Sequence, residues 1–142
     1  MTINARQDEI VEEFELFDDW MDKYEYIIQL GKELPLIDAK YKTDENLIKG
    51  CQSKVWLHTE MRDGLLHFSA DSDALITKGL VSMVIQVLSG QKPKDIADAE
   101  IYFIDKIGLQ SHLSPTRSNG LLSMLKQMKL YAVAYQAKSL QQ

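Results

Sequence analysis

Residues 53–70 read Ser-Lys-Val-Trp-Leu-His-Thr-Glu-Met-Arg-Asp-Gly-Leu-Leu-His-Phe-Ser-Ala. Segments 53–61 and 65–70 are rich in residues that favour strands, and Asp63-Gly64 lies between them. This dipeptide favours a two-residue type I′ turn, because both of its positions need positive φ angles. The stretch therefore predicts a β-hairpin in which Arg62 pairs with Leu65.

The length of the turn also fixes which residues face each other along the hairpin. The expected pairs are Leu57–Ala70, Thr59–Phe68 and Glu60–His67. Because side chains alternate between the two faces of a strand, the faces differ in character. The face expected to be buried carries Val55, Leu57, Met61, Leu66, Phe68 and Ala70. The wetter face carries Lys54, Trp56, His58, Glu60, His67 and Ser69, and its Trp56 is either covered by another element or anchors a partner.

Apolar periodicity predicts two helices before the hairpin. The first is expected over residues 4–17, with one face formed by Ile10, Phe14, Phe17 and Met21. The second is expected from Asp19 to about Leu30, capped by Asp18 or Asp19 and ended by Gly31. Residues 34–50 are expected to be mostly loop.

Two further helices are predicted after the hairpin. Asp71-Ser72-Asp73 is expected to begin a helix that continues to about Ser89, because acidic and hydroxyl residues suit the positive end of a helix. Its expected buried stripe is Leu80, Val84, Val87 and Leu88. Ser114-Pro115 begins the last helix, whose buried side is expected to be Leu121, Leu125, Met128, Ala132 and Tyr135. A short apolar run over residues 101–104 indicates a third strand.

This order of elements does not alternate strand and helix, as a parallel α/β sheet would require. We expect an α+β fold in which a small antiparallel sheet of about three strands packs against helices. No repeat or linker interrupts the chain, and its 142 residues suit a single domain over residues 1–142.

Charge limits the class of partner. The net charge at pH 7 is −5, which argues against nucleic-acid binding, because that affinity comes from neutralising phosphates with Lys and Arg. Residues 1–50 contain 13 acidic and 6 basic residues, whereas residues 115–142 contain four basic and no acidic ones. The uneven charge reflects either two solvated surfaces or an acidic patch that steers a protein partner.

The expected location is the cytoplasm. The first residues lack the apolar core of a secretory signal, and no stretch of 18 apolar residues is present to span a membrane. The single Cys also suits a reducing compartment. One thiol excludes an intramolecular disulfide and a zinc site built from several thiolates.

Cys51 is the main candidate for chemistry. It follows Gly50 and stands directly before the first predicted strand, and loops at strand ends often present reactive side chains. The flanking Lys49 and Lys54 would favour the thiolate. The alternative is that Cys51 packs as a small apolar residue, which is the commoner role of a free Cys.

The histidines offer a catalytic partner for Cys51, and each has a simpler explanation. His67 is either the base of a Cys–His pair or the cross-strand partner of Glu60. His112 either joins Cys51 or packs locally. Three scattered His and one Cys show no spacing typical of a metal site.

Three charged residues, Asp71, Asp73 and Arg117, have either a structural or a functional explanation. Asp71 and Asp73 are either paired carboxylates or the caps of the helix that they are expected to begin. Arg117 lies in the first turn of the last predicted helix, where a cation is unfavourable. An anionic partner would explain that position.

The segment Asn46-Leu-Ile-Lys-Gly-Cys-Gln-Ser-Lys-Val-Trp56 resembles the signature of the SufE family of sulfur-acceptor proteins. Three more blocks resemble the family in the same order along the chain, and they span residues 24–35, 71–80 and 108–121. Together the blocks cover nearly the whole chain, so the resemblance is far more specific than a Gly-Cys pair alone.

The resemblance implies a function. SufE proteins accept sulfur from the persulfide of a pyridoxal-phosphate cysteine desulfurase, stimulate that enzyme and pass the sulfur to an iron–sulfur cluster scaffold. The accepting residue would be Cys51. Pyridoxal phosphate would belong to the partner, so no cofactor is expected in this chain. The family fold, α+β and related to the IscU-type scaffolds, agrees with the fold expected from the residues.

The resemblance also implies a docking site. Cys51 is expected to be partly buried in the free protein and to swing out on docking, with Gly50 as the hinge. The residues expected to support the Cys51 loop or shape the docking surface are Gln52, Ser53, His67, Asp71, Asp73 and Arg117.

Two alternatives come from other functional classes. One is a self-contained thiol enzyme that uses His67 or His112, and it would turn over without a partner. The other is an interaction module in which Cys51 only packs. In every case we expect a monomer or a weak homodimer.

Overall fold

The structure is a computed structural model that describes residues 1–34, 37–51 and 53–140. In chain order, its elements are α1 (Ile3–Glu15), α2 (Trp20–Lys32), the 3₁₀ turns η1 (Ala39–Tyr41) and η2 (Asp44–Asn46), β1 (Val55–Arg62), β2 (Leu65–Ser72), α3 (Leu75–Leu88), α4 (Pro93–Asp98), α5 (Phe103–Lys106), α6 (Leu109–His112) and α7 (Pro115–Leu140). No helix within these described ranges has the length and apolar content needed to cross a lipid bilayer.

The hairpin has the predicted register. Strands β1 and β2 are antiparallel, and their pairs include Leu57–Ala70, Thr59–Phe68, Glu60–His67 and Arg62–Leu65. Both turn residues have positive φ, 54° at Asp63 and 77° at Gly64, as a type I′ turn requires. The local turn chemistry therefore sets the pairing of the whole sheet.

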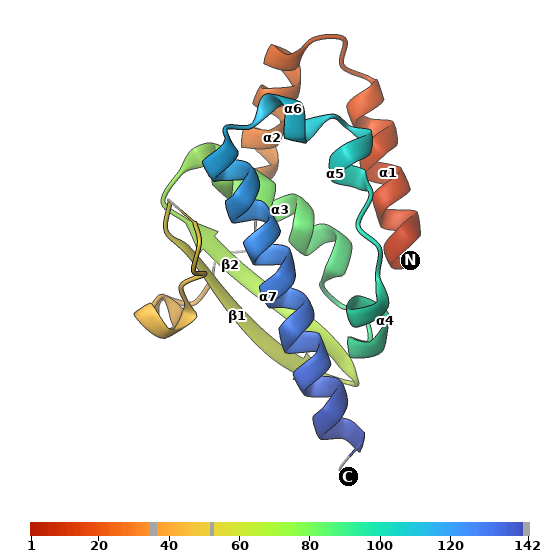
Figure 1. Ribbon diagram of the computed structural model, residues 1–142, viewed down its shortest axis with the longest axis vertical. Helices are drawn as coiled ribbons and strands as arrows, with labels where there is room; N and C mark the ends of the chain where they lie inside the picture. Colours follow the sequence, from red (N-terminus) through yellow and green to blue (C-terminus); the bar gives the residue numbers. More distant parts are fainter. Residues whose placement is uncertain (35–36, 52, 141–142) are drawn as a thin grey trace.

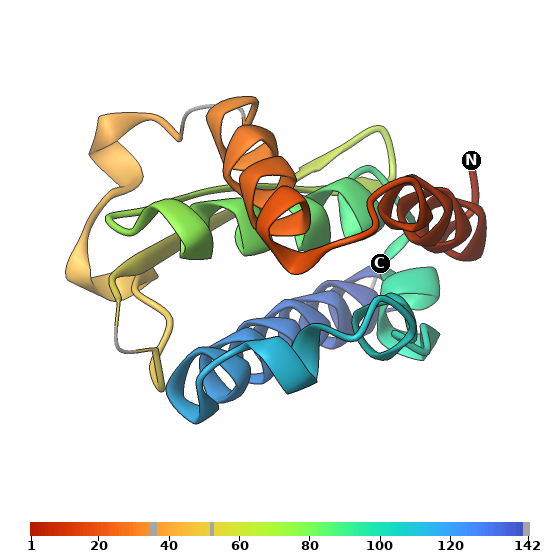
Figure 2. The ribbon, with the colours of Figure 1, turned by 90° about the horizontal axis from the view of Figure 1, so that it is seen from above.

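The hairpin turns its apolar face toward the helices. On this face, Val55, Leu57, Leu66, Phe68 and Ala70 are buried and Met61 is half-buried. Figure 1 shows α3 and α7 lying against the hairpin, with α1 and α2 at the opposite end from the C-terminus. Seen from above in Figure 2, α3 lies between α2 on one side and α7 on the other. The mixed fold of helices on a small antiparallel sheet is as predicted.

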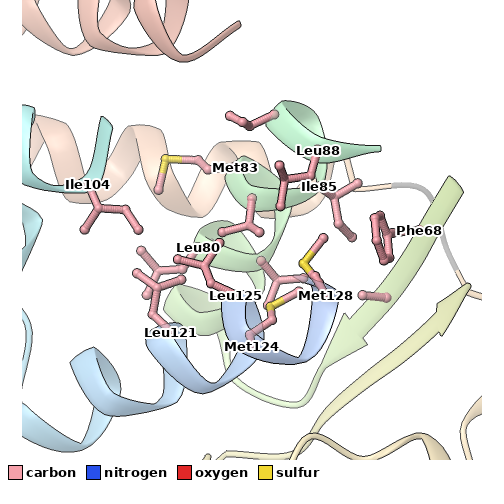
Figure 3. Packing of buried hydrophobic residues seen from close by; sticks show 14 of the residues in the cluster. Phe68, Leu80, Met83, Ile85, Leu88, Ile104, Leu121, Met124, Leu125 and Met128 are labelled. Atoms are coloured by element: carbon pink, nitrogen blue, oxygen red, sulfur yellow. The ribbon is translucent and has the colours of Figure 1, made fainter. Parts of the chain in front are cut away.

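The core forms where α3 and α7 meet. The four residues predicted for the buried stripe of α3, and the first four predicted for α7, are all buried: Leu80, Val84, Val87, Leu88, Leu121, Leu125, Met128 and Ala132. Tyr135 is half-buried. Figure 3 shows Leu80 of α3 packed among the side chains of Leu121 and Leu125 of α7. This contact holds the beginning of α7 close to the sheet, beside the Cys51 loop.

The wetter face of the hairpin is partly covered by the segment that precedes it. The ring of Tyr41 in η1 stacks on His58, with 3.6 Å between the ring centroids. The ammonium group of Lys42 lies 4.7 Å from the centroid of the Trp56 ring. Trp56 is half-buried, and this segment covers part of it, which favours the first of the two roles that we predicted for it.

Residues 101–104 do not form the third strand that we predicted. Helix α5 begins within this run, at Phe103, and the described part of the chain has a sheet of two strands. The buried side chain of Gln7 accepts hydrogen bonds from the backbone N–H groups of Tyr102 and Phe103, at 2.8 and 3.2 Å. It also donates to the carbonyl of Glu100 at 3.0 Å. A side chain thus satisfies the backbone groups that a neighbouring strand would otherwise bind.

Gly31 does not end the second helix. It lies inside α2, which continues to Lys32, and it is buried against α3. A Cβ atom on Gly31 would lie 2.8 Å from the backbone nitrogen of Gly79. The prediction that Gly31 ends the helix was wrong. The absence of a side chain at Gly31 instead allows α2 and α3 to pack closely.

The boundaries of two other helices also differ from the prediction. Strand β2 continues to Ser72, and α3 begins at Leu75 without a side-chain cap, so Asp71 and Asp73 do not cap it. Helix α1 ends at Glu15, and Met21 lies on α2 with 73% of its surface exposed. The break between α1 and α2 changes the direction of the chain, and for this reason the apolar periodicity of α1 does not extend to Met21.

The close crossing of α2 and α3 predicts the effect of a small substitution. In Gly79→Ala the new Cβ would overlap the carbonyl oxygen of Ile27, so one of the helices must shift. We expect the free energy of unfolding in urea to fall by about 1–3 kcal/mol, the usual cost of overpacking. Gln86→Ala, on the exposed side of the same helix, is the control and should change it by less than about 0.5 kcal/mol. Equal stabilities for the two variants would contradict this account.

Candidate functional site

Cys51 lies in a short loop whose two ends are both fixed. The backbone N–H of Ile48 donates to the carbonyl of Val55 at 2.9 Å, which closes the base of the loop. On the strand side, the N–H of Lys54 donates to the carboxylate of Asp73 at 3.0 Å, and the N–H of Asp73 donates to the carbonyl of Lys54 at 3.2 Å. The loop over residues 49–54 is therefore anchored at its ends, and Cys51 lies between them.

The middle of this loop rests on α7. The Sγ atom of Cys51 lies 3.5 Å from the carbonyl oxygen of Gly120, to which the thiol donates a weak hydrogen bond. Gly50 has a φ of +91°, a backbone conformation that residues with a Cβ rarely adopt. A Cβ on Gly50 would also lie 2.7 Å from the hydroxyl of Ser123. The positive φ and the close approach of Ser123 explain why this position needs glycine, and the role of Gly50 as a hinge stays a prediction.

A small cavity opens beside the thiol, with a volume of about 90 Å³. Its walls come from the loop, β1, α3 and α7, and both apolar and polar side chains line them. The lining residues are Cys51, Ser53, Val55, Thr77, Leu80, Val81, Thr116, Arg117, Gly120, Leu121 and Met124. The cavity has room for a few small atoms next to Sγ, enough for an added sulfur, and it is well below the several hundred Å³ of a typical small-molecule site.

Burial controls the reactivity of Cys51. The residue is half-buried, and the loss of contact with water raises the pKa of its thiol above the ordinary value. Lys49 and Lys54, predicted to favour the thiolate, are both exposed to solvent. In this conformation the thiol is therefore mostly protonated at neutral pH and is a poor nucleophile.

The predicted supporting residues are placed at different distances from Cys51. Ser53 and Arg117 line the cavity with it, and Asp73 anchors the end of its loop. His67 faces Glu60, which is five residues along β1 from Val55 and thus roughly 17 Å away at the usual rise of a strand. Gln52 lies outside the described residues. The structure thus brings Ser53, Asp73 and Arg117 to the loop and leaves His67 near the other end of the hairpin.

Asp71 holds two lysines behind the loop. It faces Trp56 across the hairpin, and its carboxylate lies 3.0 Å from the ammonium of Lys42 and 3.4 Å from that of Lys78. Burial alone would raise the pKa of this carboxyl. The hydrogen bonds from Lys42 and from the N–H of Ser72, together with the charge of Lys78, outweigh burial and hold the pKa below its usual range.

The histidines proposed for a catalytic pair lie elsewhere. His112 stacks on Trp20, with 3.7 Å between the ring centroids, and its carbonyl accepts a hydrogen bond from the hydroxyl of Tyr24. Among the described residues, the cavity lining contains no histidine, and no group of three or more His, Cys, Asp or Glu side chains is arranged to hold a metal ion. His112 therefore stacks on a residue of α2 and does not join Cys51.

Sequence reasoning missed the part of α7 that holds Cys51. Gly120 and Ser123 contact the loop, and Thr77 of α3 lines the cavity. One signal was present, because glycine is unfavourable inside a helix and Gly120 is placed six residues into a predicted one. Such a glycine indicates that another part of the chain approaches the helix closely.

Comparison with known proteins identifies the family. The model of the SufE family, described as an Fe-S metabolism associated domain, matches residues 8–132. The chain belongs to the SufE family. This membership connects it with iron–sulfur metabolism and confirms the resemblance seen in the sequence.

Curated relatives in the SufE family match over most of their length. An uncharacterized SufE-like protein of Rhizobium meliloti (strain 1021) is 42% identical over 127 residues, which cover 86% of this chain and 91% of the relative. Uncharacterized SufE-like proteins of Rhizobium etli and Synechocystis sp. are 43% and 37% identical, covering 88% and 89% of this chain and 88% and 80% of their own lengths.

The SufE fold is also present in a solved structure of much lower sequence identity. The solution structure of a hypothetical protein from Thermus thermophilus superposes with a TM-score of 0.75 at 15% identity. The match covers 91% of this chain and 94% of that one. At this identity the similarity concerns the fold alone.

The burial of Cys51 predicts the pH dependence of its alkylation. Iodoacetamide reacts with the thiolate, so the rate should rise with pH and reach half its maximum above the ordinary thiol pKa of about 8.5. In 8 M urea the burial is lost, and the midpoint should fall to the ordinary value. Mass spectrometry of time points gives both rates. A midpoint in the native protein at or below that in urea would contradict the burial of the thiol.

The lowered pKa of Asp71 predicts a loss of stability in acid. A carboxyl with a depressed folded-state pKa stabilises the fold above its unfolded pKa of about 3.9, and this contribution is lost as the pH falls through the lower folded value. Asp71→Asn should lower the free energy of unfolding at pH 7 by about 1–3 kcal/mol. The difference from the parent should shrink as the pH falls below about 4.

The control for this substitution is Glu60→Gln. Its ion pair with Arg62 is exposed, at 3.8 Å, so its removal should cost less than about 1 kcal/mol. Urea unfolding from pH 2 to 7 measures both variants. A pH-independent loss in Asp71→Asn would show that the lysine contacts are not responsible.

Proposed function

We propose that this chain accepts sulfur on Cys51 from the persulfide of a cysteine desulfurase, stimulates that enzyme, and passes the sulfur to an iron–sulfur cluster scaffold. The observation that carries the proposal is the position of Cys51 in a loop anchored at both ends, beside a cavity of about 90 Å³. Membership of a family connected with iron–sulfur metabolism supports it.

The chemical step needs no external oxidant or reductant. The Cys51 thiolate attacks the outer sulfur of the desulfurase persulfide, and the bond between the two sulfurs of that persulfide breaks. A new S–S bond forms on Cys51, and the desulfurase cysteine leaves as a thiolate, which takes up the proton that Cys51 lost. In total, a thiol and a persulfide exchange one neutral sulfur atom.

The raised pKa of the Cys51 thiol gives the partner a role in this step. While the thiol is held half-buried beside the cavity, few molecules carry the reactive thiolate at neutral pH. Docking would move Cys51 away from α7 about Gly50, and the pKa would then fall because burial no longer penalises the charge. Transfer would thus occur mainly in the complex.

Stimulation of the desulfurase follows from the same step. The desulfurase cannot begin another cycle while its own cysteine carries sulfur, so removal of that sulfur restores the free thiol. In this role the chain is a carrier and an activator, and its covalent intermediate is a persulfide on Cys51. Pyridoxal phosphate, which releases sulfur from free cysteine, belongs to the partner.

Arg117 and Asp73 are the charged groups that we propose for the docking surface. Arg117 is exposed in the first turn of α7 and lines the mouth of the cavity, where it suits an acidic group of the partner. Asp73 is exposed at the end of the loop. Asp71 forms ion pairs with Lys42 and Lys78 and so fixes the positions of these two lysines. Ser53 lines the cavity.

Sulfur loading tests the proposal directly. We expect that mixing the protein with a cysteine desulfurase from the same organism and free cysteine adds one or more sulfur atoms to its intact mass. The addition should disappear with dithiothreitol and should be absent in Cys51→Ser, which keeps the size of the side chain. Desulfurase turnover should rise with the parent chain and not with Cys51→Ser.

The outcomes separate the proposal from its alternatives. No added sulfur with any desulfurase of that organism, while Cys51 remains open to alkylation, would reject the carrier function. Full stimulation by Cys51→Ser would instead favour an interaction module.

A further inference from the structure

Cys51 contacts the backbone of α7 at Gly120, whose carbonyl oxygen lies 3.5 Å from Sγ. A Cβ atom on Gly120 would lie 3.3 Å from Sγ, 3.5 Å from the Cα and 3.7 Å from the Cβ of Cys51. Gly120 is itself buried. No other residue type leaves this space open, so the helix backbone itself forms the surface on which Cys51 rests.

One turn further along α7, Ser123 makes the second contact with the same loop. Its hydroxyl would lie 2.7 Å from a Cβ on Gly50 and its Cβ 3.4 Å away, so Gly50 fits against the serine because it has no side chain. The loop and α7 thus approach each other twice, and at each approach one partner is a glycine. We call Gly120 and Ser123 the loop seat.

The ends of the loop are held by other parts of the chain. The base bond of Ile48 with Val55 and the bonds of Lys54 with Asp73 involve neither α7 nor Cys51. Loss of contact with the loop seat would therefore free the middle of the loop and leave its ends in place. Whether Cys51 is held in the cavity then depends on a small area of α7.

We infer that Gly120 is a positioning residue for sulfur transfer, because its missing side chain allows α7 to hold Cys51 against the cavity. A methyl group at position 120 would lie 3.3 Å from Sγ, so Cys51 must shift by a few tenths of an ångström, and we expect it to shift away from α7. That this contact keeps the acceptor sulfur covered until a partner docks rests on the proposed function. The position of Cys51 against Gly120 is independent of that function.

Gly120→Ala tests the inference in the free protein. Alkylation of Cys51 by iodoacetamide at pH 7 should become roughly tenfold faster. Inserting a methyl group into this packed contact destabilises the covered position of Cys51, and the usual cost of overpacking corresponds to about that factor in the population of the exposed position. The midpoint of the pH profile should also fall toward that of an exposed thiol. A residue with a merely structural role would not move this midpoint.

Two further variants make the test specific. Asn119→Ala, exposed on the same turn of α7, raises the helix propensity in the same way without adding an atom near Cys51, and it should leave the rate unchanged. Ser123→Val enlarges the other half of the loop seat and should act in the same direction as Gly120→Ala. Because Ser123 is half-buried, this second variant should fold even if the first does not.

Sulfur loading separates this inference from the proposed function. If the parent chain accepts sulfur, Gly120→Ala should accept it too, since Cys51 is intact, but the loaded sulfur should be lost to glutathione several times faster. If the parent accepts none, the proposed function fails, while the alkylation result still decides the role of Gly120.

A negative result is equally clear. Circular dichroism and thermal unfolding identify which variants are folded. If the folded variants at positions 120 and 123 keep the alkylation rate and pH midpoint of the parent, the inference is overturned.

Discussion

The pairing of Val55 with Ser72 joins the two chain segments on which both the core and the site depend. It extends one step beyond the strands, to the reciprocal hydrogen bonds of Lys54 with Asp73, which fix one end of the Cys51 loop. A slip of one residue in this register would turn the apolar face of the hairpin outward. The same slip would separate the loop from its anchor. One antiparallel register therefore determines the packing and the position of the thiol.

The environment of Cys51 favours a protected sulfur over a reactive one. Burial raises the pKa of its thiol, and the cavity beside it is small and mostly apolar. These properties would slow an enzyme that had to ionise this thiol alone. They suit a carrier, because a sulfur that has less access to water and to other thiols is less readily oxidised or exchanged. The Gly120 contact makes this protection depend on the close packing of one helix turn.

Sequence rules correctly predicted the elements that depend on interactions between residues close together in the chain. Asp63-Gly64 determines its own turn and hence the hairpin register, and Ser114 caps α7 through its hydroxyl, which accepts from the N–H of Arg117. The same rules were wrong where distant groups intervene. Gly31 was predicted to end a helix and instead meets Gly79, and residues 101–104 lose their strand because Gln7 binds the backbone there. Neither partner can be identified from the neighbouring sequence.

The sequence by itself determined the mixed fold, the hairpin register and the resemblance to the SufE family, and it made Cys51 the main candidate for chemistry, because each depends on residues adjacent in the chain or on the order of motifs. Only the tertiary structure decided that Arg117 lies beside Cys51 while His67 does not, that Asp71 binds two lysines instead of capping a helix, and that Gly120 receives the thiol. These facts depend on how α3 and α7 pack on the hairpin. Such packing brings together residues that are far apart in the chain, as with Cys51 and Gly120, which are 69 positions apart, and no local sequence pattern indicates that they are neighbours.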